Sequence, residues 1–154
     1  MRDEIPALLP GEDTAQLAAK ARMLEEYIAD QASNSDFQLP LTSPAPKVLL
    51  HGHCHQKAMG VMSSIKKTLS LLPDTEVEIV ETSCCGMAGA FGYGSETHDI
   101  SRAMAELDLA PAIRKTDKDT LIVADGTSCR HQVADLTMRK PIHMARLLEL
   151  ALKK

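Results

Sequence analysis

Residues 76–92, with the sequence EVEIVETSCCGMAGAFG, join a short apolar run to two adjacent cysteines and a glycine-rich loop. Val77, Ile79 and Val80 favour extended structure, which predicts a buried strand over Glu76–Glu81. The adjacent thiols are poorly suited to a disulfide with each other, because the ring that they would close is strained. Neighbouring thiolates suit a polynuclear iron–sulfur centre, in which neighbouring iron atoms each take a thiolate. The stretch therefore predicts a strand that carries metal-binding thiols just beyond its carboxyl end.

Two further apolar runs predict strands over Lys47–His51 and Thr120–Ala124. Helical segments separate the three strands along the chain. A strand–helix–strand order of this kind implies a parallel sheet with right-handed crossovers. We therefore expect an α/β fold, with a parallel sheet of three to four strands flanked by helices.

The helical segments are recognised from their apolar periodicity. The first has Ala58, Val61, Met62, Ile65, Leu69 and Leu72 on one face and ends at Pro73. The second is expected to start near Ser95, to turn Ile100, Ala103, Met104 and Leu107 inward, and to break or restart at Pro111. The third starts around Thr127 or Ser128, and Pro141 opens the last, which carries Met144, Leu147, Leu148 and Ala151.

The chain divides into three parts by composition. Residues 1–31 form an N-terminal helical arm, in which a stripe of Leu17, Ala21, Leu24 and Ile28 predicts one helix over residues 14–31. Residues 32–46 lose this periodicity and are rich in Ser and Pro, which marks a connector. Residues 47–154 form the main domain. The apolar stripe of the arm must be covered by its own domain, by a neighbour such as a second copy in a homodimer, or by the rest of a parent protein.

The four cysteines all follow strands of the predicted sheet. Cys54 follows the first strand, Cys84 and Cys85 follow the second, and Cys129 follows the third. Because folds of this class place sites beyond the carboxyl ends of parallel strands, we expect the four thiols to meet at one edge. The convergence predicts a single metal site with these cysteines as ligands.

The cysteine spacing, Cys-x29-Cys-Cys-x43-Cys, lacks the close pairs of structural zinc sites and of bacterial ferredoxins. Gly86, Gly89 and Gly92 can adopt positive φ and bring backbone N–H groups close to the sulfurs. Such donors stabilise a reduced, more negative cluster. These three glycines are therefore expected to form the backbone of the cluster loop.

Histidines flank two of the cysteines. His53, His55 and His131 are candidates for groups that orient the thiolates or for zinc ligands, since imidazole and thiolate both suit zinc. His51, inside the predicted strand, is expected to hydrogen-bond with the backbone.

Two other sites are weaker interpretations of the same residues. The glycine pattern matches neither dinucleotide-binding nor P-loop spacing, and no lysine is placed for a phosphate. A cysteine hydrolase with Cys85, His55 and Gln132 is conceivable, but a vicinal second thiol has no clear use in that mechanism.

Composition narrows the class of protein. The 154 residues carry a net charge of −4, which argues against non-specific nucleic-acid binding. No apolar run is long enough to cross a membrane, and the N-terminus has no secretory signal. Four cysteines in such a chain favour metal or redox chemistry over disulfides, and a cytoplasmic location, with or without attachment to the inner face of the membrane.

Three motifs resemble a known family: HCHQKA at 53–58, TSCCGMAGAFGY at 82–93 and GTSCRHQ at 126–132. They resemble the cysteine-rich CCG domain, a family that includes one subunit each of heterodisulfide reductase and of anaerobic glycerol-3-phosphate dehydrogenase, and the iron–sulfur subunit of glycolate oxidase. The likeness is greatest to the C-terminal region of FAD-linked oxidases of the D-lactate and D-2-hydroxyglutarate dehydrogenase type, and it covers most of the chain.

The resemblance implies a Rossmann-like domain in which Cys54, Cys84, Cys85 and Cys129 hold a [4Fe–4S] cluster. It also implies that the chain passes electrons from a flavin to an acceptor, with FAD bound by another domain or subunit of a parent oxidoreductase. The substrate would be a 2-hydroxy acid, and the chain alone is not expected to turn it over.

The sequence departs from the family pattern at two places. The last family motif is often Cys-x-x-Cys, and its first cysteine falls on Gly126. A segment like Arg2–Leu9 follows a further cysteine in the FAD-linked relatives, so the chain is expected to be a C-terminal fragment of a longer oxidoreductase. These departures keep a second hypothesis open, in which the chain is a zinc-binding or degenerate domain with a structural or assembly role.

Overall fold

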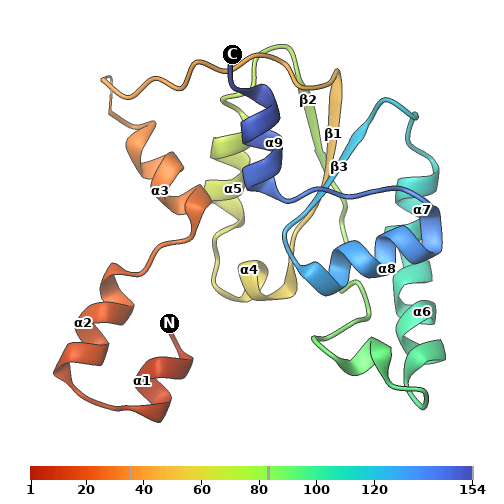
Figure 1. Ribbon diagram of the computed structural model, residues 1–154, viewed down its shortest axis with the longest axis horizontal. Coiled ribbons are helices and arrows are strands. Elements are labelled where there is room, and N and C mark those ends of the chain that lie inside the picture. Colours follow the sequence, from red (N-terminus) through yellow and green to blue (C-terminus); the bar gives the residue numbers. More distant parts are fainter. Residues whose placement is uncertain (35, 83, 154) are drawn as a thin grey trace.

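The computed structural model describes residues 1–34, 36–82 and 84–153. Ser35 of the expected connector, Ser83 of the cysteine motif and the C-terminal Lys154 lie outside the described residues. The remaining chain forms a three-stranded parallel sheet with helices on both faces (Figure 1). The α/β class expected from the sequence is confirmed.

The sheet has the order β2–β1–β3, with β1 (Lys47–His51) between β2 (Glu76–Ile79) and β3 (Leu121–Ala124). The strands start and end within two residues of their expected bounds. Ile142 adds one parallel bridge to Val123, which is the beginning of a fourth strand on the β3 side. The observed sheet therefore agrees with the expected three to four strands.

The helices of the described residues have the following bounds: α1 (Glu4–Leu8), α2 (Glu12–Lys20), α3 (Leu24–Gln31), α4 (Cys54–Ala58), α5 (Met62–Leu69), α6 (His98–Leu107), α7 (Leu109–Arg114), α8 (Thr127–Thr137) and α9 (Met144–Ala151). A 3₁₀ turn, η1, covers Phe91–Tyr93. In the described part of the chain, no helix combines the length and the apolar character that a membrane span requires.

Alternate residues of the central strands face opposite layers, as the two-residue period of a strand requires. Val48, Leu50 and Val123 pack against α3, α5 and α9 on one face. Leu49 and Ile122 pack against α7 and α8 on the other face, in the same apolar cluster as Cys85 and Cys129. The two layers are visible on either side of the sheet in Figure 1. The cysteines therefore belong to the α7–α8 layer.

The N-terminal arm differs from the expected single helix over residues 14–31. It contains α1, which was not expected, and the backbone is extended at Ala21 and Met23, between α2 and α3. The Arg2 guanidinium donates two hydrogen bonds to the Ala21 carbonyl, at 2.9 and 2.8 Å, and pairs with Glu26. Glu26 in turn accepts from the Met23 N–H at the start of α3. These long-range contacts stabilise the break that local periodicity did not indicate.

Helix α6 also differs from expectation, because it starts at His98 and turns a different face inward. The side chains predicted to be inside, Ile100, Ala103, Met104 and Leu107, are exposed. The buried positions are the small residues Ser101 and Ala105. Small side chains let the helix approach the glycine loop and α8 closely, and that contact fixes the helix rotation.

Two further helices have later or shorter bounds than expected. The helix expected over 58–72 is divided into α4 and α5 by a turn at Gly60, whose φ is +70°. Helix α9 starts at Met144 rather than at Pro141, because Ile142 pairs with β3 first. The interruption expected at Pro111 lies earlier, at Asp108 between α6 and α7, and the proline falls in the first turn of α7, where the helix restarts.

Candidate metal centre

Cys85 and Cys129 form the buried part of the site. Cys85 follows β2, and Cys129 lies in the first turn of α8, directly after β3. Their sulfurs are 3.1 Å apart, and the residues are 2% and 1% exposed. Two thiols from chain segments far apart in sequence therefore meet in the core at the carboxyl edge of the sheet.

The hydrogen bond between the two buried thiols moves their pKa values in opposite directions. The hydrogen bond from the Cys129 thiol, together with the neighbouring His51 ring and the Met87 N–H, lowers the pKa of Cys85 to about 4, against the opposing effect of burial. The same hydrogen bond and burial raise the pKa of Cys129. One thiolate is thus available at neutral pH without a metal, and a metal ion would displace the second proton.

His51 lies against these thiols. It is the last residue of β1, pairs with Ala124 in register and is 1% exposed. The alternation of β1 places it on the same face as Leu49, and one of its ring nitrogens lies within 4.8 Å of the sulfurs of Cys85 and Cys129. Neither ring nitrogen makes a hydrogen bond of good geometry in the described part of the chain, although the ring lies close enough to Cys85 to favour its thiolate. The expected hydrogen bond between His51 and the backbone is therefore wrong.

Cys54 and Cys84 form the outer part of the site. Both are partly exposed. Burial, followed by a hydrogen bond with Cys84, raises the pKa of Cys54. The Gly86 N–H donates to the Cys84 sulfur at 3.3 Å, so the expected approach of a loop N–H group to a thiol is observed at Gly86. The four cysteines are therefore brought to the same edge.

The glycine loop is held tightly against α6. Gly86 has a φ of +87°, and a Cβ there would lie 2.1 Å from the Ser101 carbonyl oxygen. A Cβ at Gly92 would lie 2.3 Å from the Met87 sulfur. Gly89 also has positive φ, at +69°, and lines the cavity beside the thiols. The loop therefore requires its glycines for conformation and packing, and the Gly92 N–H bonds to the Met87 carbonyl rather than to a sulfur.

Gln132 holds the loop in place, which the sequence did not indicate. Its side-chain N–H groups donate to the Cys85 carbonyl at 3.2 Å and to the carbonyl and hydroxyl of Ser101 at 3.0 Å. Because the side-chain N–H groups of Gln132 donate to Cys85 and Ser101, they do not orient a histidine. This contact argues against the hydrolase interpretation, in which Gln132 would position His55.

His53 fills the space beside Gly126. Its Nδ1 accepts from the His55 N–H at 3.1 Å and caps α4. A Cβ at residue 126 would lie 2.3 Å from His53 Cδ2 and 2.9 Å from the Cys129 sulfur. The position where the family pattern often has a cysteine is therefore next to the thiols, and an imidazole occupies the room that its side chain would need.

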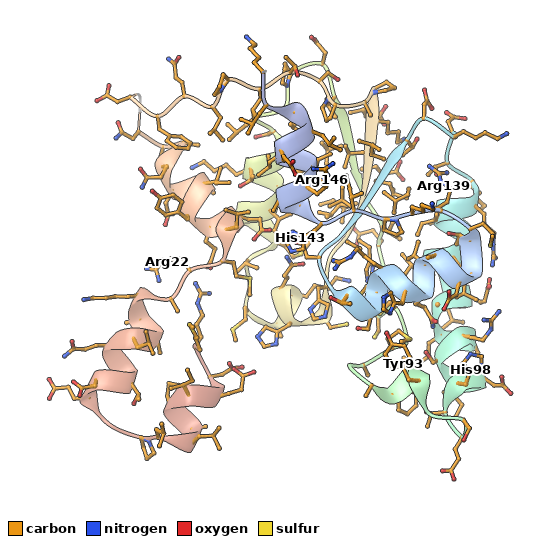
Figure 2. The ribbon with its side chains drawn as sticks, viewed as in Figure 1. Arg22, Tyr93, His98, Arg139, His143 and Arg146 are labelled. Carbon is orange, nitrogen blue, oxygen red and sulfur yellow. The ribbon has the colours of Figure 1, made fainter. Side chains whose placement is uncertain are left out.

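The other two candidate histidines lie further out. His55 is exposed, and its Nε2 lies 3.9 Å from Asp3 of the arm. His131 is exposed on α8, and its Nδ1 is 2.6 Å from the hydroxyl of Tyr93. Tyr93, labelled in Figure 2, lies on the η1 turn below α8. The structure thus brings His53 beside the thiols and gives His131 a different partner.

A second cavity of about 390 Å³ lies between α3 and the carboxyl edge of the sheet. Its lining includes Glu25, His53, Asp125, Gly126 and His143. Burial, opposed by a backbone hydrogen bond and supported by the nearby Asp125, raises the pKa of Glu25 to about 7. His143 caps α9 beside this cavity and is labelled in Figure 2. The arm therefore places a titrating carboxyl group next to the outer part of the site.

The donor set fits a soft metal or an iron–sulfur cluster. Four thiols line one edge, and a cavity of about 320 Å³ lies against Cys54, Cys85 and Cys129. Thiolates favour zinc and iron–sulfur clusters over hard cations such as magnesium. The buried His51 ring, which lacks a partner among the described residues, is a further donor in reach of the inner thiols.

The chain is similar over its whole length to one subunit of the anaerobic glycerol-3-phosphate dehydrogenase from Escherichia coli strain K12. The two are 28% identical over 154 residues, which cover 99% of this chain and 37% of that relative. The D-2-hydroxyglutarate dehydrogenase of Pseudomonas putida is 34% identical over 109 residues, covering 68% of this chain and 10% of that enzyme. The enzyme of the same name from Escherichia coli is 36% identical over 58 residues.

No family model and no solved structure matches the chain. The expected resemblance to the glycerol-3-phosphate dehydrogenase subunit and to D-2-hydroxyglutarate dehydrogenases is confirmed by these relatives. The chain spans just over a third of the first relative and about a tenth of the second.

Proposed function

We propose that this homologue of dehydrogenase subunits is an electron-transfer module whose four cysteines bind a [4Fe–4S] cluster. The observation that carries the proposal is the convergence of Cys54, Cys84, Cys85 and Cys129 at the carboxyl edge of one parallel sheet, with the inner sulfurs 3.1 Å apart. The cluster would supply one-electron chemistry, for which the cysteine side chains have no counterpart of their own.

Each part of the protein has a role in this proposal. The four thiolates bind iron, and the Gly86 N–H donates to the Cys84 sulfur, which stabilises added negative charge. Gln132 fixes the Cys85 backbone through its carbonyl. Burial of the inner thiols excludes water on that side. The outer thiols lie nearer the surface, where an electron donor or acceptor approaches.

The electron donor and the substrate are proposed from the names of the relatives. We propose a flavin domain or subunit as the electron donor, with FAD bound outside this chain, and a 2-hydroxy acid as the substrate oxidised there. The names of the relatives, a glycerol-3-phosphate dehydrogenase subunit and two D-2-hydroxyglutarate dehydrogenases, support a dehydrogenase context. We also propose a cytoplasmic location, because four cysteines that are not joined in disulfides suit a reducing compartment.

A second function has one observation in its favour. This chain has Gly126 at the position beside Cys129 where the family pattern often has a cysteine, and the His53 ring fills the space. A site with fewer thiols and a nearby imidazole also suits zinc, which would give the chain a structural or assembly role.

Anaerobic reconstitution of the whole chain with ferrous iron and sulfide separates the two functions. The electron-transfer proposal expects about four irons and four sulfides per chain and a broad visible absorption that bleaches on reduction. Cys84→Ser should lower iron and sulfide content, whereas Ser95→Ala, at an exposed serine, should not. Retention of zinc with no incorporation of iron or sulfide would contradict the proposal and favour the structural role.

A further inference from the structure

We infer that the imidazole of His51 is a direct ligand of the metal centre that Cys85 and Cys129 bind. The inference rests on the proposed function for the identity of the metal, and on the structure for the choice of residue. It assigns a ligand from inside β1, where the cysteine motifs do not extend.

The position of His51 is fixed by the sheet. The residue ends the central strand and pairs in register with Ala124 of β3. Strand alternation turns its side chain toward the α7–α8 layer, where the two inner thiols lie. The candidate donor atoms of His51, Cys85 and Cys129 all lie within 4.8 Å of one another, and all three residues are buried. A metal ion placed among these atoms has ligands from three separate segments.

The hydrogen bonding of His51 points to a missing partner. Its two ring nitrogens are buried and have no hydrogen-bond partner among the described residues. A buried polar group left without a partner is costly, so native structures rarely tolerate one. Coordination of a metal by one nitrogen removes that cost at the nitrogen concerned. Tight burial against two thiols therefore favours a ligand over an idle imidazole.

Because residue 126 is a glycine rather than a cysteine, a histidine ligand should change the reduction potential of the centre. His51 would add a neutral donor on the inner side, while His53 occupies the outer space beside Gly126. A neutral imidazole leaves the centre less negative than a thiolate would, and replacement of cysteine by histidine ligands raises the reduction potential of iron–sulfur centres. The centre of this chain should therefore have a higher potential than a centre in which a thiolate takes the place of His51.

The test uses the full chain labelled with ¹⁵N-histidine, loaded in parallel with iron and sulfide and with Co²⁺ as a probe of the same donors. Pulsed EPR of the reduced cluster should show a ¹⁵N coupling of a directly bound nitrogen. His51→Leu should remove the coupling, and His98→Asn, at an exposed histidine, should keep it. Co²⁺ affinity should fall on the order of 100-fold in His51→Leu. His51→Cys should bind the cluster at a lower potential than the unsubstituted chain.

The outcomes separate this inference from the proposed function. A cluster without a bound-nitrogen coupling in the unsubstituted chain overturns the role of His51 and leaves the cluster in place. Co²⁺ bound with a nitrogen ligand, in a chain that takes up no iron or sulfide, keeps His51 as a ligand and overturns the electron-transfer function. A chain that binds neither metal overturns both. A missing coupling in the unsubstituted chain overturns the inference without any variant. If His51→Leu does not fold, His51→Cys assigns the coupling instead, because it too should remove it.

Discussion

The inner and outer parts of the thiol site are built differently. We define the inner part as His51, Cys85 and Cys129, which are buried, and the outer part as His53, Cys54 and Cys84, which are partly exposed. The inner residues lie in or beside the apolar cluster between the sheet and helices α7 and α8. The outer residues lie at the start of α4 and at the beginning of the glycine loop.

The difference in burial suggests that the two parts have different effects on the metal centre. A buried donor set that the core holds in place can bind a metal with little reorganisation, because its side chains have few alternative conformations. Donors at the surface can move, react or be reached by a partner. We therefore expect the inner part to set the affinity of the centre and the outer part to set its access.

Serine substitutions at the two parts should give the largest effect. Cys129→Ser should abolish cluster loading, with iron content on the order of a tenth of that of the unsubstituted chain or less, because it removes a ligand from the rigid part. Cys54→Ser should keep a substantial fraction of the iron, since the outer position can take a hydroxyl or a water. Iron and sulfide content after anaerobic reconstitution measures both. Equal losses in the two variants would show that the inner and outer parts do not differ.

Oxidation of the metal-free chain is the second way to test the comparison. In air, we expect a disulfide between Cys85 and Cys129, whose sulfurs are already 3.1 Å apart, rather than between the adjacent cysteines. Two thiols would lose two electrons and two protons, and dioxygen would be reduced to hydrogen peroxide. Closing this long loop should raise the free energy of unfolding by up to about 4 kcal/mol.

Peptide mapping by mass spectrometry under non-reducing conditions identifies the bridge. Cys85→Ala should remove it, and Cys54→Ala should not. A bridge that joins Cys54 to Cys84 instead would show that access, rather than proximity in the core, decides which thiols react.

The sequence predicted the cysteines of both parts of the site, but it did not predict the histidine of the inner part. The strands and the meeting of the four cysteines followed from local patterns, because apolar β-branched runs and parallel topology determine both. The position of His51 beside Cys85 and Cys129 was missed, although alternation from Leu49 along the strand indicated the face to which it turns. That signal could have been used.

Other features depend on contacts that no local pattern contains. The break between α2 and α3 follows from the bonds of Arg2 to the Ala21 carbonyl. The rotation of α6 follows from the close approach of Gly86 to Ser101. Both join segments well apart in the sequence, so helical periodicity alone predicted the wrong bounds and the wrong buried face.

The carboxyl group of Glu25 should make stability depend on pH on the outer side of the site. Its pKa in the folded chain, about 7, lies above the usual value of 4.5, so the folded state binds the extra proton. The free energy of unfolding should therefore fall as pH rises from about 4.5 through 7, by on the order of 2 kcal/mol. Glu25→Gln should remove this fall and stabilise the chain at pH 8.

Urea unfolding of the metal-free chain at pH 5 and pH 8 measures the effect, with Glu96→Gln as the exposed control. If the unsubstituted chain and Glu25→Gln lose the same stability between these pH values, the carboxyl group is ionised in both states. The cavity shared by Glu25, His53 and Gly126 would then be wetter than its lining indicates.

The smallest expected effect concerns Gly126 and His53. Gly126→Ala should lower the free energy of unfolding by about 1–2 kcal/mol, because the new Cβ would lie 2.3 Å from His53 Cδ2 and the ring must move off its cap on α4. His53→Ala loses that cap and costs about 1 kcal/mol by itself. In the double variant the contact with the ring is gone and only the 2.9 Å approach to the Cys129 sulfur remains. The two costs should therefore not add, and a coupling of about 1 kcal/mol should appear in a double-mutant cycle. Additive costs would mean that the ring leaves Gly126 freely. The imidazole would then be a mobile group of the outer part, and it would not compensate for the thiol that residue 126 lacks.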